Sequence, residues 1–125
     1  MVRIAHCDDS MIQQEMLKQW LNFYMIKKGV SLESFSFSSG DELLESVKNG
    51  NNYDVFLMDI ILPGKRGTEI ASALRKMVPD AKIIFMTATS AFAHDEAVDG
   101  AVGYLAKPIN YETLYMLLDT ALGRI

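Results

Sequence analysis

Cysteine is almost absent from this sequence: Cys7 is the only one among 125 residues. A disulfide within the chain is therefore impossible, and a cysteine-rich metal site is excluded. The two histidines, His6 and His94, have no second histidine or cysteine at the spacing of a metal site. These shortages predict a protein of the reducing cytoplasm that has no centre for a soft metal, with Cys7 as a small buried hydrophobic residue.

Long apolar runs and long runs of like charge are also missing. The sequence turns acidic at Asp8 before a signal peptide can develop, and no later apolar run approaches the length that crosses a bilayer. No run of like charges exceeds two residues, and the net charge is -4. We therefore expect no secretion, no membrane contact and no direct binding of nucleic acid.

The length and the apolar content, half of all residues, suit one compact domain over residues 1–125. The chain has no internal repeat, low-complexity tract or linker-like stretch. If the natural protein has an effector domain, we expect it outside these residues.

Short apolar segments alternate with segments of helical period. The apolar segments cover residues 2–7, 30–37, 55–58, 83–86 and 103–106. Four of them lack polar alternation, which is typical of parallel strands buried on both faces, whereas 30–37 alternates serine with phenylalanine and suits a sheet edge. Because parallel neighbours need right-handed crossovers, the alternation predicts a doubly wound α/β fold with a five-stranded parallel sheet.

Capping residues and apolar stripes predict the helices. Ser10 and Ser39 each stand three residues before a Gln or Glu, Asn110 suits the N-cap of the last helix, and Pro79 follows the end of the third. A weaker helix is expected at about 92–99. The expected stripes are Ile12, Met16, Trp20, Leu21, Tyr24 and Met25; Leu43, Leu44 and Val47; Ile70, Ala71, Leu74, Met77 and Val78; and Leu114, Leu117, Leu118, Ala121 and Leu122.

Polar residues stand at the carboxyl ends of four apolar segments. They are Asp8 with Asp9, then Asp59, Thr87 and Lys107. In a parallel sheet these ends share one edge, where ligands bind in open α/β folds. The sequence therefore predicts a pocket that holds three carboxylates, a hydroxyl and an ammonium.

This set of side chains suits phosphoryl chemistry with magnesium. Crowded carboxylates repel unless a cation offsets their charge, and Mg²⁺ prefers oxygen ligands. Asp59 would be the nucleophile that forms an aspartyl phosphate. Lys107 would supply a fixed positive charge and Thr87 a hydroxyl donor.

Four short motifs contain these residues: CDDS at 7–10, LMDIILPGKRG at 57–67, MTA at 86–88 and YLAKPI at 104–109. With these motifs the chain resembles, over nearly its whole length, the receiver domains of two-component response regulators. The resemblance implies a flavodoxin-like (β/α)5 fold with strand order 2-1-3-4-5. It also implies that Asp9, Asp59 and the backbone carbonyl of Ile61 bind Mg²⁺, that Asp8 holds the metal through water, and that Lys107 pairs with the phosphoryl group.

The same resemblance implies a switch. Thr87 would hydrogen-bond the phosphoryl group, the Tyr104 ring would follow its hydroxyl, and the peptide bond between Lys107 and Pro108 would be cis. A histidine kinase would be the phosphodonor, and limited self-phosphorylation and autodephosphorylation would not make the chain a turnover enzyme. The 92–99 helix, the 103–106 strand and the last helix would form the surface for an effector domain or partner protein, with weak dimerisation on phosphorylation.

Other interpretations remain open. Asp8 and Asp9 alone suit a helix N-cap, Asp59 alone suits a turn, and Tyr104 suits a half-exposed edge strand. An aspartyl-phosphate phosphohydrolase would need Asp-x-Asp after its first strand, whereas Asp8 and Asp9 are adjacent. A receiver-like module that binds without phosphate is a further alternative. Residues 89–98 and 100–105 resemble receivers attached to LytTR-type DNA-binding domains, so the chain is either part of such a transcription regulator or a stand-alone receiver.

Overall fold

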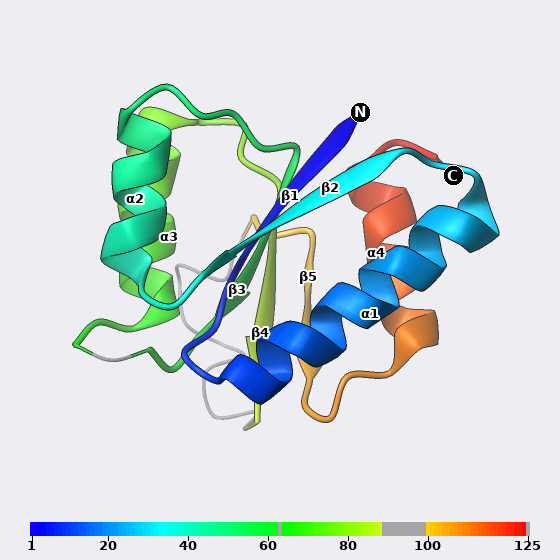
Figure 1. The fold of residues 1–125 in the computed structure, drawn as a ribbon. Coiled ribbons are helices and arrows are strands. Elements are labelled where there is room, and N and C mark those ends of the chain that lie inside the picture. The colour runs from blue at the N-terminus through cyan, green and yellow to red at the C-terminus, as the bar shows by residue number, and fades with distance from the viewer. Residues whose placement is uncertain (63, 89–99, 125) are drawn as a thin grey trace.

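A computed structural model gives the fold, and the structure describes residues 1–62, 64–88 and 100–124 (Figure 1). The strands are β1 (Val2–Cys7), β2 (Leu32–Phe37), β3 (Val55–Asp59), β4 (Ile83–Thr87) and β5 (Gly103–Ala106). The helices are α1 (Met11–Lys28), α2 (Gly40–Lys48), α3 (Gly67–Met77) and α4 (Tyr111–Ala121). The helix expected at 92–99 lies outside the described residues, so α4 is the last helix of the chain.

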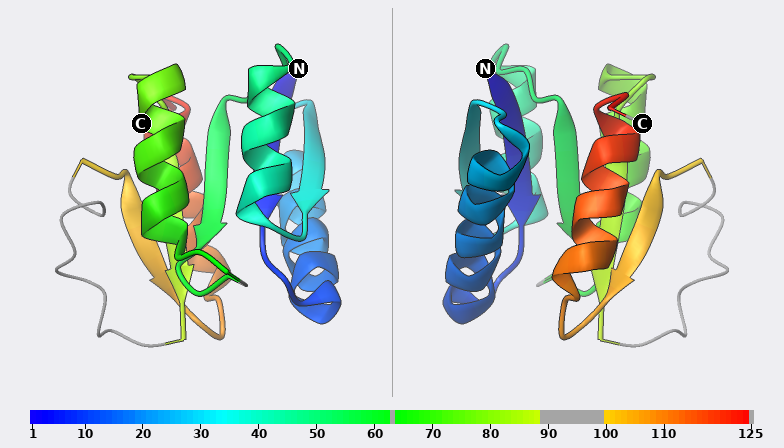
Figure 2. Two further views of the ribbon diagram at one scale, coloured as in Figure 1. Left: turned by 90° about the vertical axis from the view of Figure 1, so that its left-hand side faces the viewer. Right: turned by 90° about the vertical axis from the view of Figure 1, so that its right-hand side faces the viewer.

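The five strands form one parallel sheet in the order β2-β1-β3-β4-β5, which confirms the predicted fold and strand order. The alternating strand β2 lies at an edge, as its serines indicated. Helices α1 and α4 cover one face of the sheet, and α2 and α3 cover the other (Figures 1 and 2). The carboxyl ends of the strands consequently lie together at one edge of a three-layer molecule.

Each face of the sheet has its own apolar core. The core under α1 and α4 includes Leu21, Leu118 and Leu57, and the core under α2 and α3 includes Leu74 and Phe85. Neighbouring residues of a strand point to opposite faces, so β3 and β4 supply both cores. Each of these strands is buried along its whole length.

The predicted caps begin three of the helices. The Ser10 hydroxyl accepts a hydrogen bond from the Gln13 amide at 3.3 Å, and the Ser39 hydroxyl accepts one from the Glu42 amide at 3.2 Å. The Asn110 side-chain oxygen accepts bonds from two main-chain amides in the first turn of α4. These caps satisfy amides that have no partner within a helix.

The stripe predicted for α1 is partly wrong. Its buried residues are Leu17, Leu21 and Tyr24, whereas Ile12 is 73% exposed. Met16 is also exposed. Apolar residues cover more than one side of α1, so helical period alone does not show which side meets the sheet. Among the described residues, no helix combines the length and apolar character needed to cross a membrane.

Candidate functional site

The candidate functional side chains lie where the strands end. Asp59 is the last residue of β3, and Thr87 is the last residue of β4. Asp8 directly follows β1, and Lys107 directly follows β5. The main-chain amide of Lys107 donates to the Thr87 carbonyl at 2.8 Å, which ties the end of β5 to the end of β4. The parallel sheet therefore brings together residues about 50 positions apart in the sequence.

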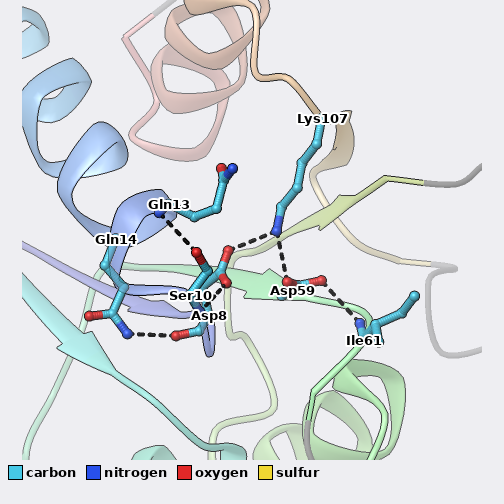
Figure 3. Close-up of polar contacts among 7 residues, drawn as sticks. All are labelled: Asp8, Ser10, Gln13, Gln14, Asp59, Ile61 and Lys107. Carbon is cyan, nitrogen blue, oxygen red and sulfur yellow. Dashed lines mark hydrogen bonds and ion pairs between the residues drawn. The ribbon is translucent and has the colours of Figure 1, made fainter.

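The Lys107 ammonium joins two buried carboxylates. Its Nζ atom lies 2.8 Å from Oδ2 of Asp8 and 2.8 Å from Oδ2 of Asp59 (Figure 3). Asp8 is 2% exposed and Asp59 is 5% exposed. Two buried negative charges thus share one positive charge, an arrangement in which the loss of the ammonium leaves both carboxylates uncompensated.

Burial and hydrogen bonding act in opposite directions on the titration of this pair. Burial raises the pKa of Asp59, although the contacts of its carboxylate with Lys107 and with the Ile61 amide, at 3.0 Å from Oδ1, lower it in part. Burial alone would lower the pKa of Lys107, but its bonds to Asp59 and Asp8 outweigh that effect and raise it. The site therefore keeps its ammonium charged while it disfavours the ionised form of Asp59.

The turn that carries Asp8 and Asp9 is held by several hydrogen bonds. Oδ1 of Asp8 accepts from the Ser10 amide at 2.9 Å, and the Asp8 amide donates to the Phe37 carbonyl at 3.1 Å. The Asp8 carbonyl accepts from Nε2 of Gln14 at 2.6 Å. Asp8 is consequently fixed through its main chain and its side chain.

Three carboxylates of the site are close enough to hold one ion. One ligand oxygen from each of Asp8, Asp9 and Asp59 lies within 4.8 Å of the others. The donors are all oxygens, which suits a hard cation such as Mg²⁺ and not a soft metal. An open cleft of about 420 Å³ reaches the group and is lined by Asp9, Asp59, Ile61, Leu62, Ala88 and Lys107.

The turn after Asp59 depends on a close main-chain approach. The Gly67 amide donates to the Ile60 carbonyl at 2.6 Å. A Cβ at Gly67 would overlap the main-chain oxygen of Asp59, so only glycine allows α3 to begin this close to the end of β3. Gly67 is the last residue of the motif LMDIILPGKRG, but the motif alone does not indicate this steric role.

The residues expected to switch differ in exposure. Thr87 is buried, whereas Tyr104 in β5 is 43% exposed. The peptide bond between Lys107 and Pro108 is cis. The structure thus brings Asp8, Asp9, Asp59, Thr87 and Lys107 to one edge, with Tyr104 on the adjoining edge strand.

Comparison with known proteins gives the family. A family model for the response regulator receiver domain matches residues 4–119. The chain belongs to this family. The receiver domain is 37% identical over 89 residues to the positive alginate biosynthesis regulatory protein of Pseudomonas aeruginosa, a match that covers 69% of this chain and 34% of the relative. It is 29% identical over 120 residues to the sensory transduction protein LytT of Bacillus anthracis, with coverage of 94% and 46%.

A solved structure of similar fold is that of the response regulator protein TrrA from Thermotoga maritima in complex with Mg²⁺-BeF. It is 34% identical to the receiver domain, has a TM-score of 0.84, and the match covers 97% of this chain and 99% of that one. The receiver domain spans about a third of the alginate regulator and just under half of LytT.

Proposed function

We propose that Asp59 is the phosphoacceptor of this receiver domain, that a histidine kinase is its donor, and that the reaction requires Mg²⁺. The observation that carries the proposal is the position of Lys107, which lines the cleft and whose ammonium contacts Asp8 and Asp59. Family membership and the Mg²⁺-BeF complex of TrrA support the same assignment.

The chemistry is a transfer between two nucleophiles. A carboxylate oxygen of Asp59 forms a bond to phosphorus while the bond from phosphorus to the donor's imidazole nitrogen breaks, and that nitrogen keeps the electron pair. Lys107 already contacts Asp59, so its ammonium is placed to stabilise the negative charge of the phosphoryl oxygens.

The residues for Mg²⁺ would be Asp9, Asp59 and the Ile61 carbonyl, with Asp8 acting through water. The bound ion would offset the repulsion between carboxylates and the incoming phosphoryl group. The receiver's own contribution is to hold these oxygens close together and to keep Asp8 oriented through the Ser10 amide.

Phosphorylation then changes a surface. The added charge of about -1.5 to -2 and its acceptor oxygens would attract the Thr87 hydroxyl and shift the population of Tyr104 conformations. The surface predicted from β5, α4 and the expected helix at 92–99, which lies outside the described residues, would report this change to an effector domain or a partner protein, with weak homodimerisation as one output. The domain would act in the cytoplasm as a switch with slow self-dephosphorylation.

The greater length of the alginate regulator and of LytT supports a role beside an effector domain, with a LytTR-type DNA-binding domain as the specific candidate. The resemblance that suggests this candidate includes residues 89–98, which lie outside the described residues. A stand-alone receiver that acts by protein contact is the alternative. Binding of the full natural protein to promoter DNA distinguishes the two.

The test is uptake of phosphate from acetyl phosphate with and without Mg²⁺, followed by mass spectrometry of the intact protein. We expect Mg²⁺-dependent uptake by the wild type, none by Asp59→Asn, and normal uptake by Asp80→Asn, which alters an exposed carboxylate before β4. Uptake by Asp59→Asn would refute the assignment. Absence of uptake by the wild type would favour a phosphate-independent module, and steady phosphate release from small phosphoesters would favour a phosphohydrolase.

A further inference from the structure

We propose that Gln14 is a positioning residue that sets the affinity of the site for Mg²⁺ through its hydrogen bond to the main chain between Asp8 and Asp9. The inference rests on the proposed function for the identity of the ion. It concerns a residue on α1, outside the strand ends that carry the other functional groups.

The hydrogen bond acts on a single peptide plane. Nε2 of Gln14 donates to the Asp8 carbonyl at 2.6 Å, and that carbonyl shares a rigid plane with the amide of Asp9. The other contacts of the turn engage the Asp8 amide and the Asp8 carboxylate. Gln14 therefore restrains the peptide plane that precedes Asp9, whereas the bond from the Ser10 amide to the Asp8 carboxylate closes the turn on the other side of Asp9.

Asp9 has particular need of such a restraint. It is the exposed member of the three carboxylates, whereas Asp8 and Asp59 are buried. Mg²⁺ requires near-ideal octahedral geometry, so a ligand oxygen on a turn that has lost one of its hydrogen bonds costs more affinity for Mg²⁺ than for a larger cation. Removal of a hydrogen-bonding group that orients metal ligands typically lowers metal affinity about 10–100-fold.

The amide of Gln14 suits this position chemically. It donates a hydrogen bond without adding charge, whereas a glutamate would add another carboxylate to an already crowded group and a lysine would add a competing cation. The same Nε2 also lies 3.4 Å from the Ser38 hydroxyl, just beyond the end of β2. Gln14 consequently links the acidic turn to the neighbouring strand end as well as to α1.

Gln13 provides a matched control in the same turn of α1. Its main-chain amide donates to Ser10, but its side-chain amide points away from Asp8 and Asp59 (Figure 3). Gln14 by contrast points its side chain back to the turn (Figure 3). Methionine has a similar length and no amide, so Gln14→Met and Gln13→Met remove the same group from two adjacent positions.

The experiment is titration of each full chain with MgCl₂ by calorimetry, without a phosphodonor, together with thermal unfolding in EDTA. We expect Gln14→Met to raise the Mg²⁺ dissociation constant about tenfold. Gln13→Met should leave it unchanged, and the two variants should unfold at the same temperature in EDTA. The main-chain amide resonance of Asp9 in metal-free protein should move in Gln14→Met and stay in place in Gln13→Met.

Equal dissociation constants for the two variants would overturn the inference, as would a wild type that binds no Mg²⁺. A lower unfolding temperature for Gln14→Met with an unchanged dissociation constant would assign Gln14 a structural role only. If Gln14→Met does not fold, Gln14→Ala against Gln13→Ala makes the same comparison. A wild type that binds Mg²⁺ in a Gln14-dependent manner but takes up no phosphate would refute the phosphoacceptor proposal and leave the role of Gln14 intact.

Discussion

Burial has different consequences in the middle of the sheet and at its carboxyl edge. Leu57 in β3 and Phe85 in β4 are fully buried among apolar side chains, and two residues further along the same strands stand Asp59 and Thr87. Burial of the apolar pair stabilises the fold. Burial of Asp59 raises its pKa and makes it dependent on Lys107. A strand thus provides stability along its length and, under the proposed function, a phosphoryl-binding group at its last residue.

The largest loss of stability is expected in the middle of the sheet. Phe85→Ala removes a fully buried ring and should lower the free energy of unfolding by about 3–5 kcal/mol, measured by urea denaturation. Phe23→Ala, the same substitution at an exposed position of α1, should change it by less than about 0.5 kcal/mol. Similar losses for the two variants would contradict the importance of the sheet interior.

A smaller loss is expected at the edge when its cation is removed. Lys107→Met leaves Asp8 and Asp59 facing each other without the ammonium and should cost about 1–3 kcal/mol, less than a fully enclosed pair would cost because the cleft is open to water. Added Mg²⁺ should recover part of this loss, since it offsets the same charges. An unfolding free energy that Mg²⁺ does not change in this variant would argue against the three carboxylates as an ion site.

The edge should also show a distinctive dependence on pH. The pKa of Asp59 is raised from its ordinary 3.8, so its contribution to stability is fully present below pH 3.8 and is lost as the pH rises through its higher value in the folded protein. The free energy of unfolding of the wild type, measured relative to that of Asp59→Asn by urea denaturation, should therefore fall as the pH rises from 3.8 through the raised pKa. A constant difference from below pH 3.8 to neutral pH would contradict the raised pKa.

Asp119 in α4 supplies the opposite case. Burial tends to raise the pKa of this carboxyl, but the Tyr24 hydroxyl at 2.6 Å and the Lys28 ammonium at 3.0 Å outweigh that tendency and lower it. Its contribution is present above pH 3.8 and is lost as the pH falls through the lowered value. Urea denaturation at a series of acidic pH values gives the difference in free energy of unfolding between the wild type and each variant. This difference should rise with pH for Asp119→Asn and fall with pH for Asp59→Asn. Changes of equal sign would contradict this assignment.

The sheet and most of its edge were predictable because two simple signals coincide there. Strands buried on both faces give uninterrupted apolar runs, and the polar residues that end them, such as Asp59 and Lys107, stand out. The contact of Gln14 with the acidic turn was not predictable, since its partner is a main-chain carbonyl that no residue type reveals. The steric role of Gly67 was not predictable either, and neither was the pairing of Tyr24 with Asp119, because these two residues lie 95 positions apart.

The smallest effect is expected for an apolar side chain that belongs to neither region. The helical period of α1 placed Ile12 on the stripe facing the core, but its side chain is largely exposed, whereas Leu17 meets the sheet. Ile12→Gln should therefore change the free energy of unfolding by less than about 0.5 kcal/mol in urea denaturation. A loss above about 2 kcal/mol would instead support the burial of Ile12 that the sequence predicts, because only a buried isoleucine makes enough contacts for such a loss.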